Sequence, residues 1–197
     1  MQINDIQLKQ LIEASLFVLD KPQTTTQLKD SVLCNFSVSK DRIKVALSEL
    51  ELDYQERGVQ LVHVAGGYRF QTAEFLSPLL QSLWQEKAPK YSRATLETLA
   101  VIAYQQPVTR GDVEQVRGVT VSSHIIKTLS DRNWIKVVGH KEVPGRPALY
   151  STTIDFLDYF GLRSLSDLPQ LSDHESLQAL FSVSALVSDI KEESTNE

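Results

Sequence analysis

VQLVHVAGGYRFQT, residues 59–72, decides the fold of the first half of the chain, because it holds two strand-forming runs joined by two glycines. Glycine tolerates the positive φ angles of a tight two-residue turn. We therefore expect Gly66 and Gly67 to form the turn of a β-hairpin. What this hairpin belongs to depends on the segments that precede it.

Three helices are predicted before the hairpin. The first covers about residues 4–20, where apolar residues recur on one helical face: Leu8, Leu11, Ile12, Leu16 and Leu19. Thr24 or Thr25 can cap a short second helix, and Ser39 can cap a third that runs to about Glu56. Three helices followed by a two-stranded hairpin is the layout of a winged helix.

The same order of elements is predicted in the second half. A helix carries Leu96, Leu99, Ala100 and Ala103 on one face and is broken by Pro107. Thr109, with Asp112 three residues on, can cap the next helix, and Ser122 can cap the third. Strands are expected at 134–138 and 148–153. The cap of the second helix and the returning strand are 44 residues apart in the first half and 40 in the second.

These patterns predict an α+β fold, mostly helical, made of two tandem winged-helix domains, each with three helices and a β-hairpin wing. The domains are expected at 1–88 and 89–171. Residues 172–197 form an acidic tail that is expected to be disordered. Within it, an apolar run at 177–187 could form either a docking helix or a helix that frays.

Charge is unevenly distributed along the chain. The net charge of −5 divides into −2 for residues 1–88, +3 for residues 89–163 and −6 for residues 164–197. Binding to duplex DNA depends on many lysine and arginine contacts to phosphate, so this supply favours at most weak, non-specific DNA binding. The first twenty residues have no basic start and no uninterrupted apolar run, which excludes a signal peptide and a membrane span there and indicates a cytoplasmic protein.

No catalytic constellation is recognisable in the sequence. The phosphate-binding and nucleophile motifs GxxxxGK[ST], GxGxxG and GxSxG are absent. The single cysteine, Cys34, and the four histidines lack the spacing of metal ligands. We therefore expect a binding protein that is not an enzyme and has no cofactor.

The third predicted helix of the first domain carries two candidate surfaces. Lys40, Arg42 and Lys44 form the best candidate for phosphate contacts, although acidic residues lie close to them in the sequence. Val45 and Leu52 fall opposite the apolar stripe, seven residues apart. A pair at heptad spacing is typical of a helix contact between subunits, so these two residues are the candidate dimer interface.

In the second domain, the helix capped by Ser122 and the turn of the hairpin are candidate partner surfaces. Ile125 and Ile126 are neighbours, about 100° apart on a helix, so one of them is expected to face a partner. Gly145-Arg146-Pro147 resembles a minor-groove clasp, but its neighbours are acidic and apolar rather than basic. The tip of a wing is the simpler interpretation, with Arg146 facing a protein partner or a phosphate.

Two long segments carry a resemblance to a known family. SRATLETLAVIAYQQPVTRGDVEQVRGV at 92–119 and GHKEVPGRPALYSTTIDFLDYFGLRSLSDLPQL at 139–171 resemble bacterial segregation and condensation protein B. The resemblance extends over about residues 6–171. One departure is His140, which follows Gly139 where the family often has an arginine.

The resemblance implies a subunit of the condensin-like SMC-kleisin complex, which condenses and segregates chromosomes in cell division. It implies a nucleoid-associated homodimer that pairs through its first domain and grips the centre of an ScpA-like kleisin, and through it an SMC ATPase, with its second. Arg117, Ile126, Arg146 and Tyr150 are the candidate kleisin contacts. The alternative is a tandem winged-helix transcription regulator, which would need two basic recognition surfaces.

Overall fold

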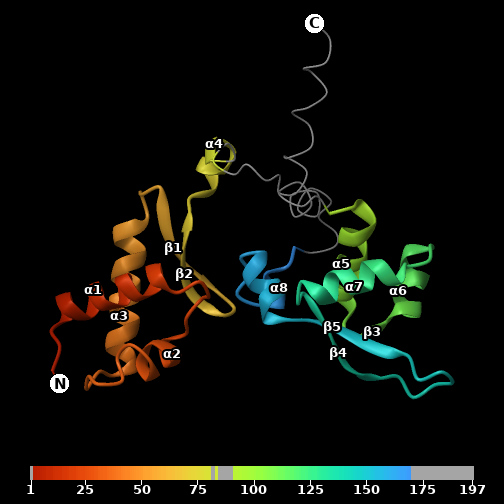
Figure 1. Cartoon of the computed structure of the whole chain (residues 1–197), viewed down its shortest axis with the longest axis horizontal. Helices are drawn as coiled ribbons and strands as arrows, with labels where there is room; N and C mark the ends of the chain where they lie inside the picture. The colour runs from red at the N-terminus through yellow and green to blue at the C-terminus, as the bar shows by residue number, and fades with distance from the viewer. Residues whose placement is uncertain (1, 81–82, 84–90, 170–197) are drawn as a thin grey trace, which may run out of the picture. The chain divides into compact units, whose positions relative to one another are not determined.

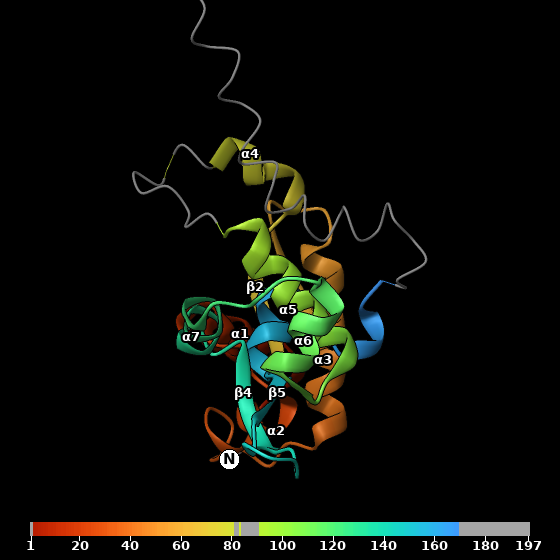
Figure 2. The ribbon, with the colours of Figure 1, turned by 90° about the vertical axis from the view of Figure 1, so that its right-hand side faces the viewer.

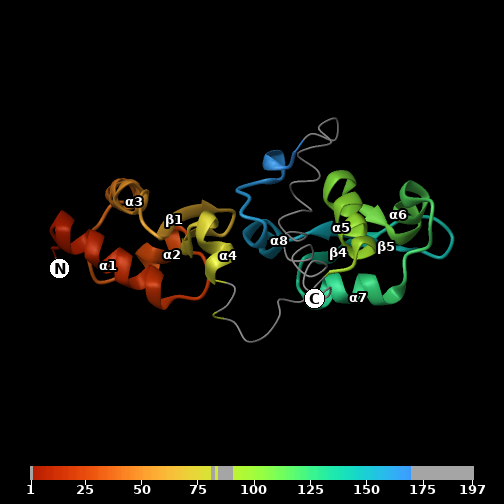
Figure 3. The same ribbon diagram turned by 90° about the horizontal axis from the view of Figure 1, so that it is seen from above.

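The structure is a computed structural model that describes residues 2–80, 83 and 91–169. These residues group into two compact units. The first contains the described residues up to 83 together with Leu157–Ser164, and the second contains the described residues 91–156 and 165–169. In each unit, three successive helices precede a β-hairpin (Figures 1 and 3), so the predicted winged-helix fold is confirmed.

The three helices of the first unit begin at side chains that cap them. They are α1 (Asp5–Val18), α2 (Thr25–Asp30) and α3 (Lys40–Tyr54). Thr24 and Ser39 accept hydrogen bonds from the first turns of α2 and α3, as predicted. Asn4 caps α1 in a reciprocal pair with Gln7. α1 ends at Val18, two residues earlier than expected.

The core of this unit lies where α1 crosses α3. Its buried members are Leu8, Ile12, Leu16, Leu28, Leu33, Val38, Ile43, Ala46, Leu47, Leu50, Tyr54 and Leu61. Each large aliphatic side chain buried there stabilises the fold by about 2 kcal/mol relative to an exposed one. Leu8, Ile12 and Leu16 come from the predicted face of α1, whereas Leu19 lies just past the helix and is exposed.

The first wing is formed by β1 (Val59–Val64) and β2 (Gly67–Thr72), which pair antiparallel. Val64 pairs with Gly67, so the turn consists of Ala65 and Gly66, and the predicted turn at Gly66-Gly67 was wrong by one residue. Gly67 has φ +122°, and the backbone of Gln23 passes so close beside it that a Cβ would not fit. Gln23 exchanges two 2.9 Å backbone hydrogen bonds with Tyr68.

The segment Leu157–Ser164 packs on the tip of this wing. The amide of Gly66 donates to Asp158 Oδ1 at 2.6 Å, and the amide of Ala65 donates to the carbonyl of Leu162 at 2.9 Å. Both turn amides are therefore satisfied within the first unit. After the wing, a 3-10 turn, η1 (Glu74–Leu76), leads into α4 (Ser77–Leu80).

The helices of the second unit are α5 (Arg93–Gln105), α6 (Arg110–Arg117) and α7 (Ser123–Asp131). Thr109 and Ser122 cap α6 and α7 as predicted. The buried face of α5 is rotated from the predicted one. Thr98 and Ile102 are fully buried, while Leu96 and Ala100 are only partly covered.

The second wing is β4 (Ile135–His140) and β5 (Ala148–Thr152), side by side in Figure 2. A third strand, β3 (Val108–Thr109), pairs with β5 and gives the order β3-β5-β4. It was not predicted, because two residues are too few to show a strand period. It corresponds to Gln23 in the first unit, which also precedes the second helix and pairs with the returning strand.

The chain continues through α8 (Ile154–Tyr159) and the 3-10 turn η3 (Leu165–Asp167). Tyr104 Oη donates to the carbonyl of Pro169 at 2.6 Å, which holds the last described residues against α5. The boundary expected at residues 88 and 89 and the acidic tail at 172–197 lie outside the described residues.

The cap of α6 gives a prediction for acid stability. The backbone amide of Thr109 and the ammonium group of Lys141 lower the pKa of Asp112 from 3.8 to about 2. The charged carboxylate therefore stabilises the second unit above pH 3.8, and this contribution is lost as the pH falls toward 2.

Asp112→Asn should lower the free energy of unfolding by about 1 kcal/mol at neutral pH and remove this pH dependence. Urea unfolding at several pH values measures both effects, with the exposed Asp131→Asn as the control; identical pH profiles would contradict the assignment.

Candidate partner-binding surfaces

The outer face of α3 exposes two apolar side chains. Val45 is 58% exposed and Leu52 is 70% exposed, while Ile43, Leu47 and Leu50 on the opposite side of the helix are buried. The two exposed residues are two helical turns apart on one face. The structure therefore brings them together on the surface, as the heptad spacing predicted.

The three cations of α3 contact groups of the same unit. The guanidinium of Arg42 bonds to Asp5 Oδ1 at 2.6 Å and to the carbonyl of Ile3 at 3.0 Å. Lys40 Nζ donates to the hydroxyl of Thr26 at 2.8 Å, and Lys44 Nζ lies 4.0 Å from Asp41. A phosphate would have to compete with these partners, so the predicted phosphate surface is weaker than the sequence alone indicates.

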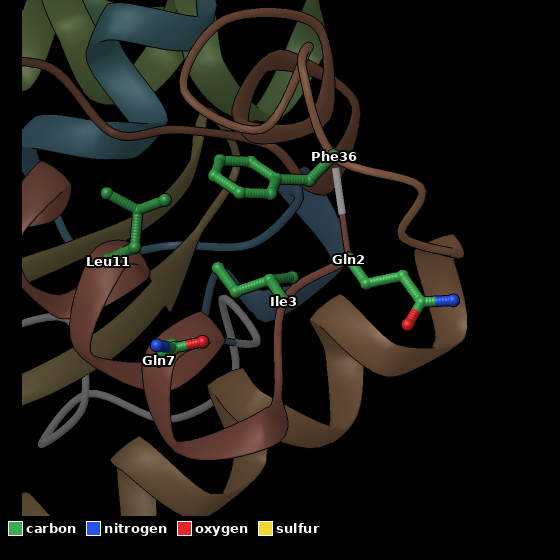
Figure 4. A pocket seen from close by; sticks show the side chains of 5 residues that line it. All are labelled: Gln2, Ile3, Gln7, Leu11 and Phe36. Carbon is green, nitrogen blue, oxygen red and sulfur yellow. The ribbon is translucent and has the colours of Figure 1, made fainter.

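A shallow pocket of about 540 Å³ lies near the start of α1 and was not predicted from the sequence. Its lining residues are Gln2, Ile3, Gln7, Leu11 and Phe36. Figure 4 shows the Gln2 amide pointing away from the three apolar side chains. No titratable side chain lines the pocket, so its chemistry suits an apolar side chain of a partner. The sequence indicated this pocket only through Ile3 and Phe36, two apolar residues that lie outside the predicted helices.

Arg117, a predicted kleisin contact, is turned into the second unit. Its side chain is only 7% exposed and donates to Glu97 Oε2 at 3.0 Å and to Thr98 Oγ1 at 3.1 Å. This guanidinium holds the pKa of Glu97 below its usual range. Arg117 therefore ties α6 to α5, and its charged group does not lie on the outer surface.

The other predicted contacts of the second unit are at least partly accessible. Ile125 and Ile126 are both half-buried on α7, and Tyr150 is half-buried in β5. Arg146 is exposed at the tip of the second wing, where Gly145 has φ +86°. Its guanidinium donates to Glu142 Oε1 at 2.9 Å, which offsets the charge that a minor-groove clasp would need.

The second wing also exposes a patch that the sequence reasoning missed. We call Lys136, Val137 and Val138 the wing patch. Val137 is 52% exposed and Val138 is 49% exposed, and a bulge between Val137 and Gly139 shifts the register there. The sequence signal for this patch was the pair Val137-Val138. Successive residues of a regular strand face opposite sides, so two consecutive valines cannot both face the core.

The described residues contain neither a candidate metal site nor a helix that could span a membrane. Among residues 2–80, 83 and 91–169, no group of three or more His, Cys, Asp and Glu side chains could hold a metal ion. None of the helices in this part of the chain is long and apolar enough to cross a membrane.

Comparison with known proteins identifies the family. The family model described as "Segregation and condensation complex subunit ScpB" matches residues 10–171, which is most of the chain. The chain belongs to the ScpB family. Its ScpB match begins within α1, continues through both winged helices and ends where the acidic tail begins.

Relatives in other bacteria have the same family name. The "Segregation and condensation protein B homolog" of Coxiella burnetii is 52% identical over 178 residues, covering 90% of this chain and 85% of the relative. The segregation and condensation protein B of Syntrophotalea carbinolica is 42% identical over 179 residues, covering 89% of this chain and 87% of the relative. The relatives therefore match this ScpB chain over most of their own length.

Solved ScpB structures are also similar to this chain. ScpB from Mycobacterium tuberculosis is 33% identical with a TM-score of 0.39, covering 82% of this chain and 99% of that one. A dimer of an ScpB N-terminal domain complexed with an ScpA peptide is 30% identical with a TM-score of 0.34. It covers 41% of this chain and 92% of that one.

Proposed function

We propose that this chain is a non-enzymatic, homodimeric subunit of a bacterial condensin-like SMC-kleisin complex that binds the central region of the kleisin. In this role it supports chromosome condensation and segregation during cell division. One observation carries the proposal beyond family membership. On α3, the helix that would read DNA in a DNA-binding winged helix, the cations are engaged by their own unit while Val45 and Leu52 are exposed.

The two domains, 1–88 and 89–171, have different roles in this proposal. The first forms the homodimer through Val45 and Leu52. The second binds an ScpA-like kleisin, and through it the SMC ATPase, with α7 and the second wing. The half-buried Ile126 and Tyr150 and the exposed Arg146 give that surface both apolar and charged contacts.

Direct DNA contact has a minor part in the proposal. The candidate cations on α3 and at the second wing tip all lie close to carboxylates or hydroxyls. Binding to phosphate would have to break these contacts, so it should be weak and strongly dependent on salt. The protein would act at the nucleoid, in the cytoplasm, through its protein partners.

Kleisin binding through α7 is tested by Ile126→Glu. A carboxylate placed in an apolar contact is costly to bury, so we expect the variant to lose the co-expressed kleisin during purification. Ile126 is only half-buried, so the thermal midpoint should fall by a few degrees at most. Mass measurement of the purified complex and thermal unfolding give the two readings.

The control is Ser130→Glu, which adds the same charge to an exposed position of the same helix. It should retain the kleisin. Full binding by Ile126→Glu would exclude α7 as the interface. Binding retained by Ile126→Glu but lost by Phe36→Ala would place the kleisin on the shallow pocket of the first unit instead.

A further inference from the structure

The wing patch has the composition of a docking surface for an acidic, apolar segment. Val137 and Val138 each expose about half of their surface next to Lys136. Lys136 is exposed and makes no ion pair with any other residue that the structure describes. The patch lies on β4, an outer strand of the sheet order β3-β5-β4. An occupant would gain by covering the valines and by bringing carboxylates to the lysine.

The end of this chain has the complementary composition. Residues 172–197 carry six acidic residues and one lysine. The apolar run at 177–187 lies between two acidic groups, Asp173 and Glu175 before it and Asp189, Glu192 and Glu193 after it. The wing patch, which this run would meet, lies within residues 89–163, the part of the sequence with a net charge of +3.

The point where the tail leaves the described structure is close to the second wing. Pro169 is held by the hydroxyl of Tyr104. Two residues after Tyr104, the side-chain oxygen of Gln106 accepts the amide of Thr152 at 2.6 Å. Thr152 pairs with Ile135, which is two residues before Val137 on β4.

The tether is long enough for the run to reach the wing patch. Leu177 comes eight residues after Pro169, and an extended chain of eight residue steps spans up to about 26 Å. The last step of the path from Pro169 to the patch, from Ile135 to Val137, is two residues of β4, which advance by about 7 Å. A segment joined to the same unit by so short a tether meets the patch at a high effective concentration.

We propose that residues 177–187 of this chain dock on the wing patch of the same molecule, with the flanking carboxylates near Lys136. By the spacing of residues in a helix, Leu177, Leu180, Phe181, Ser184 and Val187 share one face, which would cover the valines. Docked there, the tail excludes other chains from the same valines.

The test is site-directed cross-linking in the full-length chain. Cys34 is the single cysteine, so Cys34→Ser gives a background without thiols. Into it we place Val138→Cys with Ser184→Cys and treat the protein with a short bismaleimide. The control pairs Ser184→Cys with Val116→Cys, an equally exposed valine of the same unit that lies on α6.

We expect an intramolecular cross-link at monomer mass on a denaturing gel, about tenfold more abundant than in the control. Adding Phe181→Glu should reduce it to the control level. A product of twice the mass would show that a second copy occupies the patch, and cross-linking no greater than in the control would show that the tail does not dock. Either result overturns the proposal.

A second readout is amide exchange of residues 136–139 in the otherwise unmodified chain. This exchange should be faster in the variant Leu180→Ser/Phe181→Ser than in the unsubstituted chain, and an unchanged exchange rate contradicts the proposal.

Discussion

Replacing Val45 and Leu52 together with glutamate should convert the protein from a dimer into a monomer. Both side chains lie on the outer face of α3, away from the core, so the substitutions should leave the first unit folded. A two-fold symmetric interface presents each position twice and would have to bury four carboxylates. Burying unpaired charges costs several kcal/mol, which is enough to dissociate an interface centred on these residues. Light scattering measures the mass directly.

The matched control is Val116→Glu with Val119→Glu. These valines are similarly exposed, but they lie at and just after the end of α6 in the second unit. The control adds the same charge and should remain a dimer. An unchanged mass for the α3 variant would remove Val45 and Leu52 from the interface.

Gly67→Ala should destabilise the first unit by about 3 to 5 kcal/mol. A Cβ at this position would lie 2.2 Å from the carbonyl carbon of Gln23 and 2.5 Å from the amide nitrogen of Thr24. These are backbone atoms, so relief requires the wing to move away from the start of α2. That movement breaks both hydrogen bonds between Gln23 and Tyr68, and the φ of +122° adds strain for any side chain. Urea unfolding followed by amide exchange in β1 and β2 reports the loss.

Gly118→Ala separates the effect of backbone strain from the effect of the steric clash. Gly118 also has a positive φ, +69°, but a Cβ there meets no atom within 4 Å. This substitution should cost about 1 to 2 kcal/mol from backbone strain alone. Equal losses for the two variants would show that the contact between the first wing and Gln23 is not close in solution.

Local signals in the sequence predicted most of the helical framework. Thr24, Ser39, Thr109 and Ser122 cap the helices as predicted, because a cap depends only on a side chain and the amides two or three residues after it. The exposure of Val45 and Leu52 also followed from helical periodicity. Each of these predictions depends on residues within one element.

The features that the sequence did not reveal depend on residues far apart along the chain. The turn of the first wing is at Ala65 and Gly66, and the wing contacts a residue far away in the sequence, since Gln23 pairs with Tyr68 and passes beside Gly67. Arg42 is engaged because Asp5, 37 residues earlier, lies against it. Such contacts exist only once the helices and strands have packed together, so no local pattern can show them.

The sequence by itself therefore determined two winged helices, their caps and the exposed pair Val45 and Leu52 on the outer face of α3, since local periodicity and hydrogen bonding specify these features. Only the tertiary structure decided which charged and apolar groups remain available to a partner. Arg117 is buried against Glu97 across 20 residues, whereas Val137 and Val138 stay exposed because β4 is an outer strand with a bulge. Availability to a partner depends on what packs above each side chain, and that is a property of the folded chain.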